Sequence, residues 1–379
     1  MMNYASIAQK RWFMGKGRPI HSIEELDSLP IGGTKVSIVQ VRFENDERDC
    51  YAVIEDESKI GEVLAEYFGE KFSKESLLRA QPLNAEQSNS AFYSKGEFFF
   101  KLYRRLQVGN HPEAEIMQHL SQKAAQGFPK IAPEFYGNFS LTKSGETRTL
   151  GILEEHIPDA VNAWDLMVRT PNEKTQPGHQ NFFADAAFEL GRTTAQMHQA
   201  LKDLEGTAPQ AEEVPYDKLM GLLKANGKEA LIARVESIKA QQARDDKPSA
   251  RVLAPQRIHG DYHLGQLLYK DGKFIVLDFE GEPTRTLEYR RRLRSPAADI
   301  AGMLRSFAYA SAVRGDKDFE QTAAEAFLRG YSQESRIPVP QLKEEASPYV
   351  LGKAIYEACY ELEFRPDWFW IPERALTAI

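Results

Sequence analysis

The stretch RIHGDYHLGQLLYKDGKFIVLDFEGE, residues 257–282, constrains the fold most, because it inserts strand-like sequence into a region of helical periodicity. Two short apolar runs, LLY and FIVL, flank Asp271-Gly272, a dipeptide typical of a tight hairpin turn. Asp278 follows the second run directly. The hairpin would return Asp278 to the loop that contains Asp261. A fold for this chain must therefore hold a small β-hairpin among helices.

The polar residues of this stretch suit phosphoryl transfer to an alcohol. That reaction needs a carboxylate near the attacking hydroxyl and ligands for the magnesium ion that bridges the phosphates. Asp261 would accept the hydroxyl proton or orient the hydroxyl, and we take His259 as a second catalytic candidate. Gln266 and Asp278 offer an amide oxygen and a carboxylate, both hard donors suited to Mg²⁺. Glu280, just beyond the aspartate, is a candidate substrate contact.

Each part of this pattern also has a simpler interpretation. The tripeptide His259-Gly260-Asp261 alone would fit an ordinary turn, and Asp278 alone would fit the cap of a strand. The complete spacing favours a catalytic segment over both. Asp299, at the start of a later helix, is expected to brace the catalytic loop through backbone N–H groups.

The remainder of the chain divides into a strand-rich part and a helical part. Residues 34–43 and 50–54 predict strands, and a break in periodicity near residue 82 predicts a boundary. From about Pro158 onward helices dominate, for example FFADAAFELGRTTAQMHQAL. We therefore predict an α+β fold with the bilobal organisation of protein kinases. Its parts would be an N-terminal cap subdomain (1–82), a β-rich nucleotide-binding lobe (83–157) and a helical C-terminal lobe with the catalytic loop and sugar site (158–379).

A second group of residues is expected to bind ATP. Lys101 lies inside the apolar run FFFKLY, where an unpaired charge would be costly. In kinase-like folds such a lysine contacts the phosphates and pairs with a glutamate of the next helix. We choose Glu115 as that partner, with Glu113 as the second choice; the alternative is a lysine on the solvent face of an edge strand. The small residues Ser88, Asn89 and Ser90 would fold over the phosphates, although they also fit a common turn.

A third group, in YEACYELEFRPDW, is expected to bind a polyhydroxylated ligand. Aromatic faces stack on sugar rings, while carboxylates and a guanidinium bind hydroxyl groups. Residues four apart share one face of a helix, and a proline ends the helix after them. The alternative is a core-facing aromatic stripe with solvated glutamates. The candidate sugar contacts are Tyr356, Glu357, Tyr360, Glu361, Arg365 and Trp368.

Composition excludes several other classes of protein. A formal net charge of −7 argues against a general partner of nucleic acid or of anionic membranes. The sequence has no apolar run of transmembrane length, and its first residues lack the apolar stretch of a signal peptide. Two distant cysteines fit free thiols in a reducing compartment. We therefore expect a cytoplasmic protein with no nucleic-acid or membrane partner.

Taken together, these motifs resemble those of the maltokinases, a branch of the aminoglycoside-phosphotransferase group in the protein-kinase-like superfamily. The resemblance begins with RWFMGKGR, is densest in HGDYHLGQLL, DFEGEP and SPAADIAGMLRSFAYA, and ends with YEACYELEFRPDW. It implies ATP-dependent phosphorylation of maltose to maltose 1-phosphate, a precursor for α-glucan (glycogen) synthesis. It also implies Asp261 as catalytic base, Gln266 and Asp278 as magnesium ligands, and Lys101 as an ATP contact. Because such kinases occur fused or bound to trehalose synthase, that enzyme is a candidate partner.

Two other functions are compatible with the same residues. One is a kinase for another sugar or small molecule, above all glucosamine, since related proteins share the HGD and RPDW regions. The other is a non-catalytic binding subunit of a trehalose-converting assembly. The intact set of Lys101, Asp261, Gln266 and Asp278 argues against the latter.

Overall fold

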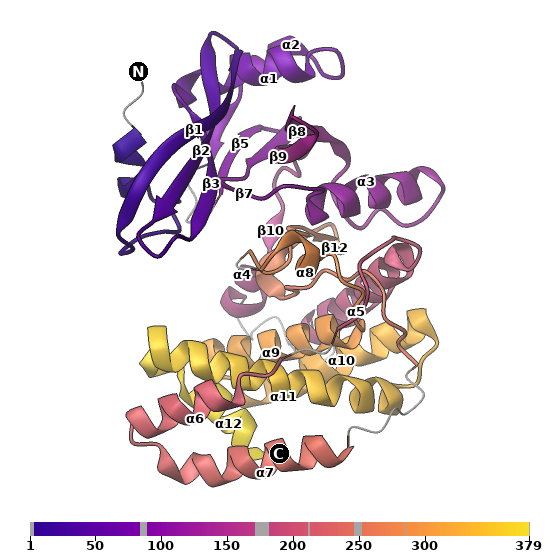
Figure 1. Ribbon diagram of the computed structural model, residues 1–379. Helices are drawn as coiled ribbons and strands as arrows, with labels where there is room; N and C mark the ends of the chain where they lie inside the picture. The colour runs from indigo at the N-terminus through magenta and orange to yellow at the C-terminus, as the bar shows by residue number, and fades with distance from the viewer. Residues whose placement is uncertain are drawn as a thin grey trace. The chain divides into compact units, whose positions relative to one another are not determined.

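The computed structural model describes residues 4–83, 89–170, 182–210, 213–245, 252–283 and 285–378. Its contacts divide the chain into two compact units (Figure 1). Unit 1 comprises Met1–Ala125, Ala132–Asp159 and Arg285–Leu287, and unit 2 comprises Gln126–Ile131, Ala160–Thr284 and Glu288–Ile379. Among the described residues, no helix combines the length and apolar character needed to cross a bilayer.

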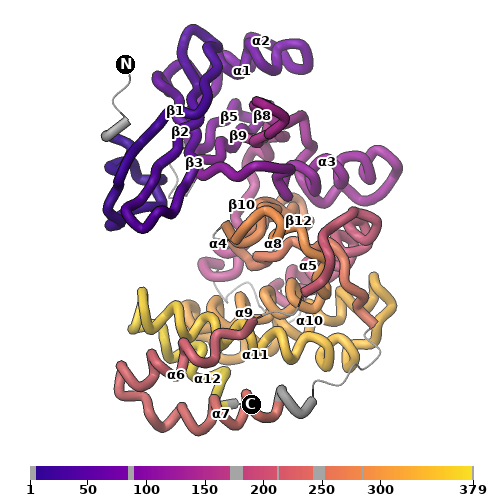
Figure 2. Tube along the Cα trace, in the orientation of Figure 1, coloured from indigo at the N-terminus to yellow at the C-terminus, as the bar shows by residue number. Residues whose placement is uncertain are grey.

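Unit 1 begins with an antiparallel sheet, which we call the cap sheet. Its strand order is β1-β2-β3-β7, and Figure 2 shows β1, β2 and β3 side by side in the indigo part of the trace. The strands β2 (Thr34–Phe43) and β3 (Arg48–Ile54) confirm the predicted strands 34–43 and 50–54. Two strands were not foreseen: β1 (Ile20–Ile31), which pairs with β2, and the short β7 (Arg105–Leu106).

The second sheet of unit 1 has the order β4-β5-β6-β9-β8 and carries Lys101. One hydrophobic core runs from the cap sheet into this sheet, since Ile38 and Val63 belong to the same buried cluster as Phe100 and Ile152. This core is continuous across residue 82, so the subdomain boundary there stays a prediction. The remaining elements of unit 1 are β4 (Gln81–Leu83), β5 (Ser90–Ser94), β6 (Phe98–Leu102), β8 (Phe135–Lys143), β9 (Glu146–Glu155), α1 (Ile60–Phe68), α2 (Lys74–Leu78), α3 (Pro112–Ala125), η1 (Tyr4–Gln9) and η2 (Glu57–Lys59).

Unit 2 is mainly helical and contains the predicted β-hairpin. The strands β11 (Leu267–Lys270) and β12 (Lys273–Val276) pair antiparallel, and β10 (Val161–Asn162) joins them. Asp271 and Gly272 both have positive φ, 50° and 81°, as a two-residue type I′ turn requires. The other elements are α4 (Ala163–Arg169), α5 (Phe182–Leu201), α6 (Tyr216–Ala225), α7 (Ile232–Asp245), α8 (Leu287–Arg290, of which Leu287 is assigned to unit 1), α9 (Ala297–Arg314), α10 (Lys317–Ser335), α11 (Val339–Phe364), α12 (Trp370–Ala378), η4 (Glu229–Leu231), η5 (Leu264–Gln266) and η6 (Pro366–Trp368).

Two glycines let α5 and α10 approach closely in unit 2. A Cβ atom on Gly191 would lie 2.0 Å from the carbonyl oxygen of Phe327, and one on Gly330 would lie 1.9 Å from that of Phe188. Both distances are far below van der Waals contact, and in each case the obstacle is backbone. The spacing of these two helices therefore requires glycine at both positions.

We predict that Gly330→Ala destabilises the protein by about 2 kcal/mol or more, because backbone must move to admit the methyl group. The control is Gly221→Ala on α6, where the added Cβ would meet nothing within 4 Å. Helix propensity alone should stabilise that variant by about 0.5–1 kcal/mol. Thermal denaturation of both variants checks the prediction, and equal melting temperatures would contradict it.

Candidate active site

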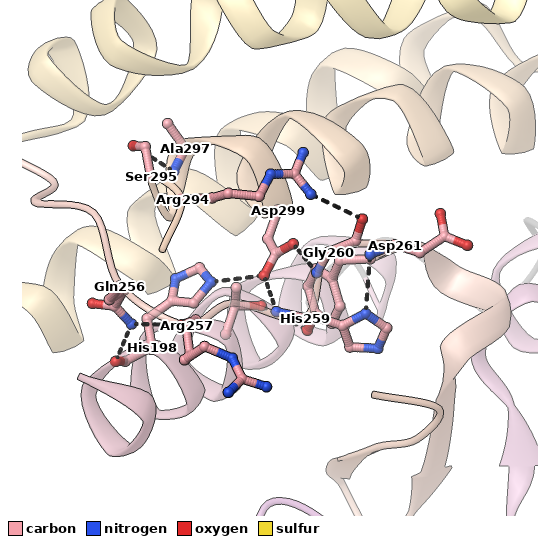
Figure 3. Close-up of polar contacts among 12 residues, drawn as sticks. His198, Gln256, Arg257, His259, Gly260, Asp261, Arg294, Ser295, Ala297 and Asp299 are labelled. Carbon is pink, nitrogen blue, oxygen red and sulfur yellow. Dashed lines mark hydrogen bonds and ion pairs between the residues drawn. The ribbon is translucent and has the colours of Figure 1, made fainter. Parts of the chain in front are cut away.

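The loop His259–Asp261, which we call the HGD loop, is held by a buried carboxylate. Asp299 lies in the first turn of α9 and is 1% exposed. Its Oδ2 atom accepts the N–H of His259 at 2.8 Å, and its Oδ1 atom accepts the N–H of Gly260 at 3.0 Å (Figure 3). Oδ2 also lies 3.1 Å from Nε2 of His198 on α5. The predicted bracing of this loop by Asp299 is confirmed.

The charge of Asp299 is stabilised by these hydrogen bonds. Burial by itself would raise the pKa of Asp299, but the hydrogen bond and charge of His198, the nearby His259 and the N–H of Gly260 outweigh it and hold the pKa below its ordinary value. The carboxylate therefore stays ionised inside unit 2. His198 is itself fixed by Tyr331, whose hydroxyl lies 2.9 Å from Nδ1.

His259 uses both ring nitrogens within the loop. Its Nδ1 atom accepts the N–H of Asp261 at 3.3 Å, so Nε2 carries the proton and donates to the carbonyl of Leu277 at 2.8 Å. The residue is 1% exposed. A ring bonded to backbone on both sides positions the loop, and the catalytic role of His259 stays a prediction.

Asp261 is the member of the loop that faces outward. Its side chain is 33% exposed, and in Figure 3 its carboxylate points away from Asp299. The Oδ1 atom of Asp261 lies 4.0 Å from Nζ of Lys353 on α11. Sequence reasoning missed Lys353, because no local pattern links a residue of a distant helix to this loop.

The hairpin brings the two predicted metal ligands together. Nε2 of Gln266, at the end of η5, donates to Oδ2 of Asp278 at 2.8 Å. The N–H of Leu277 also donates to the carbonyl of Gln266 at 2.9 Å. Asp278 has φ 61°, a left-handed backbone conformation that is uncommon outside glycine and often found at functional sites.

His263 was also missed and supports η5 at its start. Its Nδ1 atom accepts the N–H of Gly265 at 3.0 Å. Burial lowers the pKa of His263, opposed by the charges of Asp261 and Asp278. The ring therefore favours the neutral form, with its proton on Nε2.

In unit 1 the candidate nucleotide lysine is paired as expected, but with the second-choice glutamate. Nζ of Lys101 lies 3.0 Å from Oε2 of Glu113 on α3, and the hydroxyl of Tyr103 donates to the same oxygen at 2.5 Å. Lys101 and Glu113 are 9% and 2% exposed, which excludes a lysine on a solvent face. The choice of Glu115 is corrected: residues two apart on a helix point about 200° apart, so Glu115 cannot share the direction of Glu113.

The neighbouring phosphate-loop candidates lie at the start of β5. Ser88 falls outside the described residues. Oδ1 of Asn89 accepts the backbone N–H of Arg104 at 3.2 Å, and Oγ of Ser90 accepts from Nε of Arg104 at 2.8 Å. Both side chains are therefore fixed by one arginine.

The helix α11 and the residue that caps its C-terminus present a row of charged residues at four-residue spacing, which we call the α11 face: Lys353, Glu357, Glu361 and the cap residue Arg365. Glu357 accepts from Nε of Arg305 on α9 at 2.8 Å. Glu361 is 1% exposed and accepts from the hydroxyl of Tyr309 at 2.8 Å and from Arg365 at 2.7 Å. The predicted acidic residues are thus ordered by partners on α9 and α11.

The aromatic residues of this segment do not form the core-facing stripe that the alternative interpretation proposed. Tyr356 and Tyr360 are exposed, at 50% and 42%, so they form no core-facing stripe. Trp368 stacks on Tyr309, with ring centroids 6.3 Å apart and planes at 15°. Of the predicted sugar contacts on this helix, the glutamates are the less exposed and the tyrosines the more exposed.

Glu280, the remaining substrate candidate, lies beside a buried arginine. Nη1 of Arg290 is 3.5 Å from Oε2 of Glu280 and donates to its carbonyl at 3.1 Å. Glu280 is 7% exposed. The pair fixes the segment that follows Asp278. Arg290 belongs to a basic run, RTLEYRRRLR (residues 285–294), and this contact gives that residue a structural role.

The profile of the phosphotransferase enzyme family (APH) matches residues 79–341. The chain belongs to this family. It is 25% identical over 324 residues to a glucosamine kinase of Mycolicibacterium smegmatis, covering 79% of each chain. It is also 25% identical over 299 residues to a glucosamine kinase of Streptacidiphilus jiangxiensis, covering 72% of this chain and 67% of the relative.

Solved structures give the fold. A glucosamine kinase in complex with glucosamine, ADP and inorganic phosphate matches with a TM-score of 0.66 at 20% identity, over 100% of this chain and 99% of the other. A further crystal form of glucosamine kinase matches with a TM-score of 0.68 at 20% identity, over 99% and 98%. The predicted α+β protein-kinase-like fold is confirmed.

We predict that Asp299→Asn lowers the melting temperature at pH 7, because the amide cannot accept the same hydrogen bonds with a full charge. The depressed pKa of Asp299 gives stability that is present above about pH 4, the ordinary range of an unfolded aspartate, and is lost as pH falls through the folded-state pKa. The difference between wild type and variant should therefore shrink below pH 4. Thermal melts between pH 3 and pH 7 measure it; a constant difference would contradict this assignment.

Proposed function

We propose that the protein is an ATP-dependent sugar kinase that phosphorylates maltose at its anomeric hydroxyl, giving maltose 1-phosphate. The observation that carries the kinase activity is the arrangement in unit 2, where Asp299 braces the loop of Asp261 and the hairpin pairs Gln266 with Asp278. The family assignment supports the reaction class. The Lys101–Glu113 pair of unit 1 supports nucleotide binding.

The two oxygen-bearing side chains fit magnesium. Within the described part of the chain, no group of three or more His, Cys, Asp and Glu residues could by itself hold a metal ion. Mg²⁺ needs no such group, because it is commonly held by one or two protein oxygens together with water and phosphate oxygens. The side-chain amide nitrogen of Gln266 donates to Asp278, and its side-chain oxygen, Oε1, is the atom that would bind a metal. When bound, the ion would neutralise charge on the phosphates.

In the proposed reaction the acceptor oxygen bonds to the γ-phosphorus of ATP as the bond to the β,γ-bridging oxygen breaks. ADP leaves with that electron pair, and the hydroxyl proton passes to the carboxylate of Asp261. The backbone bonds of His259 and Asp299 hold Asp261 in place, so little reorganisation is needed when the substrates bind. Lys101 contributes a fixed positive charge for the phosphates of ATP.

The charges near Asp261 support a neutral acceptor. Asp261 and the two glutamates of the α11 face each have a cationic partner: Lys353 lies 4.0 Å from Asp261, Arg305 2.7 Å from Glu357, and Arg365 2.7 Å from Glu361. A sugar ammonium group would find these carboxylates already compensated, whereas hydroxyl groups can bond to either partner of a pair. This pairing favours a neutral sugar, such as maltose, over an amino sugar.

Glucosamine is the second candidate acceptor, and the named relatives favour it. Steady-state assays with ATP and either maltose, glucose or glucosamine separate the two. We expect turnover of maltose with a kcat/KM at least about tenfold above that for glucosamine. The reverse preference would make the protein a glucosamine kinase and leave the mechanism unchanged. Trehalose synthase as a partner stays a prediction from the family resemblance.

We predict that Asp261→Asn and Asp278→Ala inactivate the enzyme in different ways. Asp261→Asn should lower kcat by about 10²-fold or more, with the Kd for Mg-ATP nearly unchanged, because the lost base acts in the transition state. Asp278→Ala should weaken Mg-ATP binding about tenfold or more by removing a charged ligand. Asp271→Asn, in the hairpin turn, is the control and should behave as wild type. Equal loss of nucleotide affinity in both test variants would show that the roles are wrong.

We predict that Glu361→Gln lowers kcat/KM for the sugar by about ten- to a hundredfold, because a buried acceptor of two hydrogen bonds loses its charge. The KM for ATP should change less than about twofold. The control is Glu363→Gln, because Glu363 pairs with Lys218 on another face of α11. Unchanged sugar kinetics in a folded Glu361→Gln variant would assign the α11 face a structural role.

A further inference from the structure

Arg104 is a fully buried arginine in unit 1, two residues after the end of β6, the strand of Lys101. It is 0% exposed and ranks among the largest fully buried side chains of the described residues. A guanidinium in such a place must be paired and fully hydrogen-bonded to be tolerated. Burial lowers the pKa of Arg104, and the charge of Glu57 opposes that shift. The energetic cost of this position indicates that the side chain has a specific task.

One side of the guanidinium is bound by the cap sheet and its neighbours. Nη2 pairs with Glu57 at 2.7 Å, and Nη1 donates to the carbonyl of Ala52 on β3 at 3.4 Å. The guanidinium carbon lies 4.7 Å from the ring centroid of Trp12, within the range of a cation–π contact. The N–H of Ala52 also donates to the carbonyl of Arg104 at 2.8 Å.

The other side is bound by the start of β5. Nε donates to Oγ of Ser90 at 2.8 Å, and the backbone N–H of Arg104 donates to Oδ1 of Asn89 at 3.2 Å. Because Oγ of Ser90 is used as an acceptor, its hydroxyl hydrogen is left to donate to another group. A phosphate oxygen is such an acceptor. Arg104 thus occupies the acceptor side of the Ser90 hydroxyl and leaves it able to donate, while the cap sheet holds Arg104.

Arginine is suited to this task where lysine is not. Its planar fork supplies donors in three directions at once, here to Ser90, Glu57 and Ala52, whereas an ammonium on a flexible stem would satisfy fewer of them. The fork makes one rigid unit of residues that lie far apart in the sequence. Any shift of the cap sheet would be passed through it to the start of β5.

We propose that Arg104 is a positioning residue for the nucleotide, through which the cap sheet holds Asn89 and Ser90 in the conformation that receives the phosphates of ATP. This inference rests on the proposed kinase function. It gives the cap sheet a role in nucleotide binding, in addition to its part in the hydrophobic core.

The test compares Arg104→Lys with Arg105→Lys. Arg105 is a matched control, because its Nε and Nη2 atoms bind Asp49 of the cap sheet at 3.0 and 2.7 Å. Calorimetry gives the Kd for Mg-ATP, steady-state kinetics give the KM for the sugar, and thermal melts give stability. We expect Arg104→Lys to raise the Kd for Mg-ATP about tenfold while the sugar KM changes less than about twofold. Arg105→Lys should lower the melting temperature without changing the Kd.

A second variant covers the case in which Arg104→Lys does not fold. Glu57 is 41% exposed at its side chain, so Glu57→Gln leaves the core intact while weakening the hold on the guanidinium. It should raise the Kd for Mg-ATP about threefold.

The outcomes separate this inference from the function on which it rests. A wild-type protein that does not bind Mg-ATP would refute the kinase proposal and this inference with it. A wild-type protein that binds Mg-ATP, with folded variants at Arg104 and Glu57 that bind it equally well, would refute only the role of Arg104. A Kd raised equally in the Arg105→Lys control would assign the effect to general loosening of unit 1, which also overturns the inference.

Discussion

The buried carboxylate of Asp299 is the interaction on which the candidate active site depends. It accepts two successive N–H groups of the HGD loop and lies within hydrogen-bonding distance of His198, so one side chain fixes both the path of the loop and its neighbour helix α5. An ionised carboxylate in a buried setting is stable only when its oxygens are satisfied in this way. The outward direction of Asp261 follows from that constraint, because the backbone before it has no freedom left.

Ion pairs with buried members recur beside each group of candidate residues. Lys101–Glu113 joins β6 to α3, Arg290–Glu280 lies just after Asp278, and Arg305–Glu357 lies on the α11 face. Such pairs add little net stability, since desolvation offsets most of their attraction, but breaking one leaves an uncompensated charge. We infer that their contribution is geometric: each holds a polar side chain in one orientation within a desolvated environment.

Features that depend on a short stretch of sequence were predicted better than features that depend on contacts between distant residues. The Asp271-Gly272 turn and the apolar runs around it specify the hairpin, so the approach of Asp278 to Gln266 could be predicted from a short segment. The choice between Glu113 and Glu115 failed because it depends on the rotation of α3 about its axis. A helix periodicity of 3.6 residues does not define that rotation when both positions are polar.

The contacts that could not be predicted from the sequence are those between elements far apart along the chain. The pairing of Arg305 with Glu357, and of Lys353 with Asp261, depends on how α9, α11 and the loop meet in three dimensions. The sequence also does not define the rotation of α11: Tyr356 and Glu357 are neighbours, and only tertiary packing decides that Tyr356 is exposed while Glu357 pairs with Arg305. Strand β7 illustrates the same limit, since a two-residue strand carries no periodic signal.

The close contact of α5 and α10 also affects the hydrogen bonds that position the HGD loop. Gly191 lies two turns before His198 on α5, and its position faces the backbone of Tyr331, the residue whose hydroxyl meets His198. The spacing of the two helices therefore sets the length of the hydrogen bond between Tyr331 and His198, and through His198 the placement of Asp299. A methyl group added at Gly191 would alter more than helix packing. Through Tyr331, His198 and Asp299 it would also displace the HGD loop. The packing of α5 against α10 and the geometry of the candidate active site are therefore coupled within unit 2.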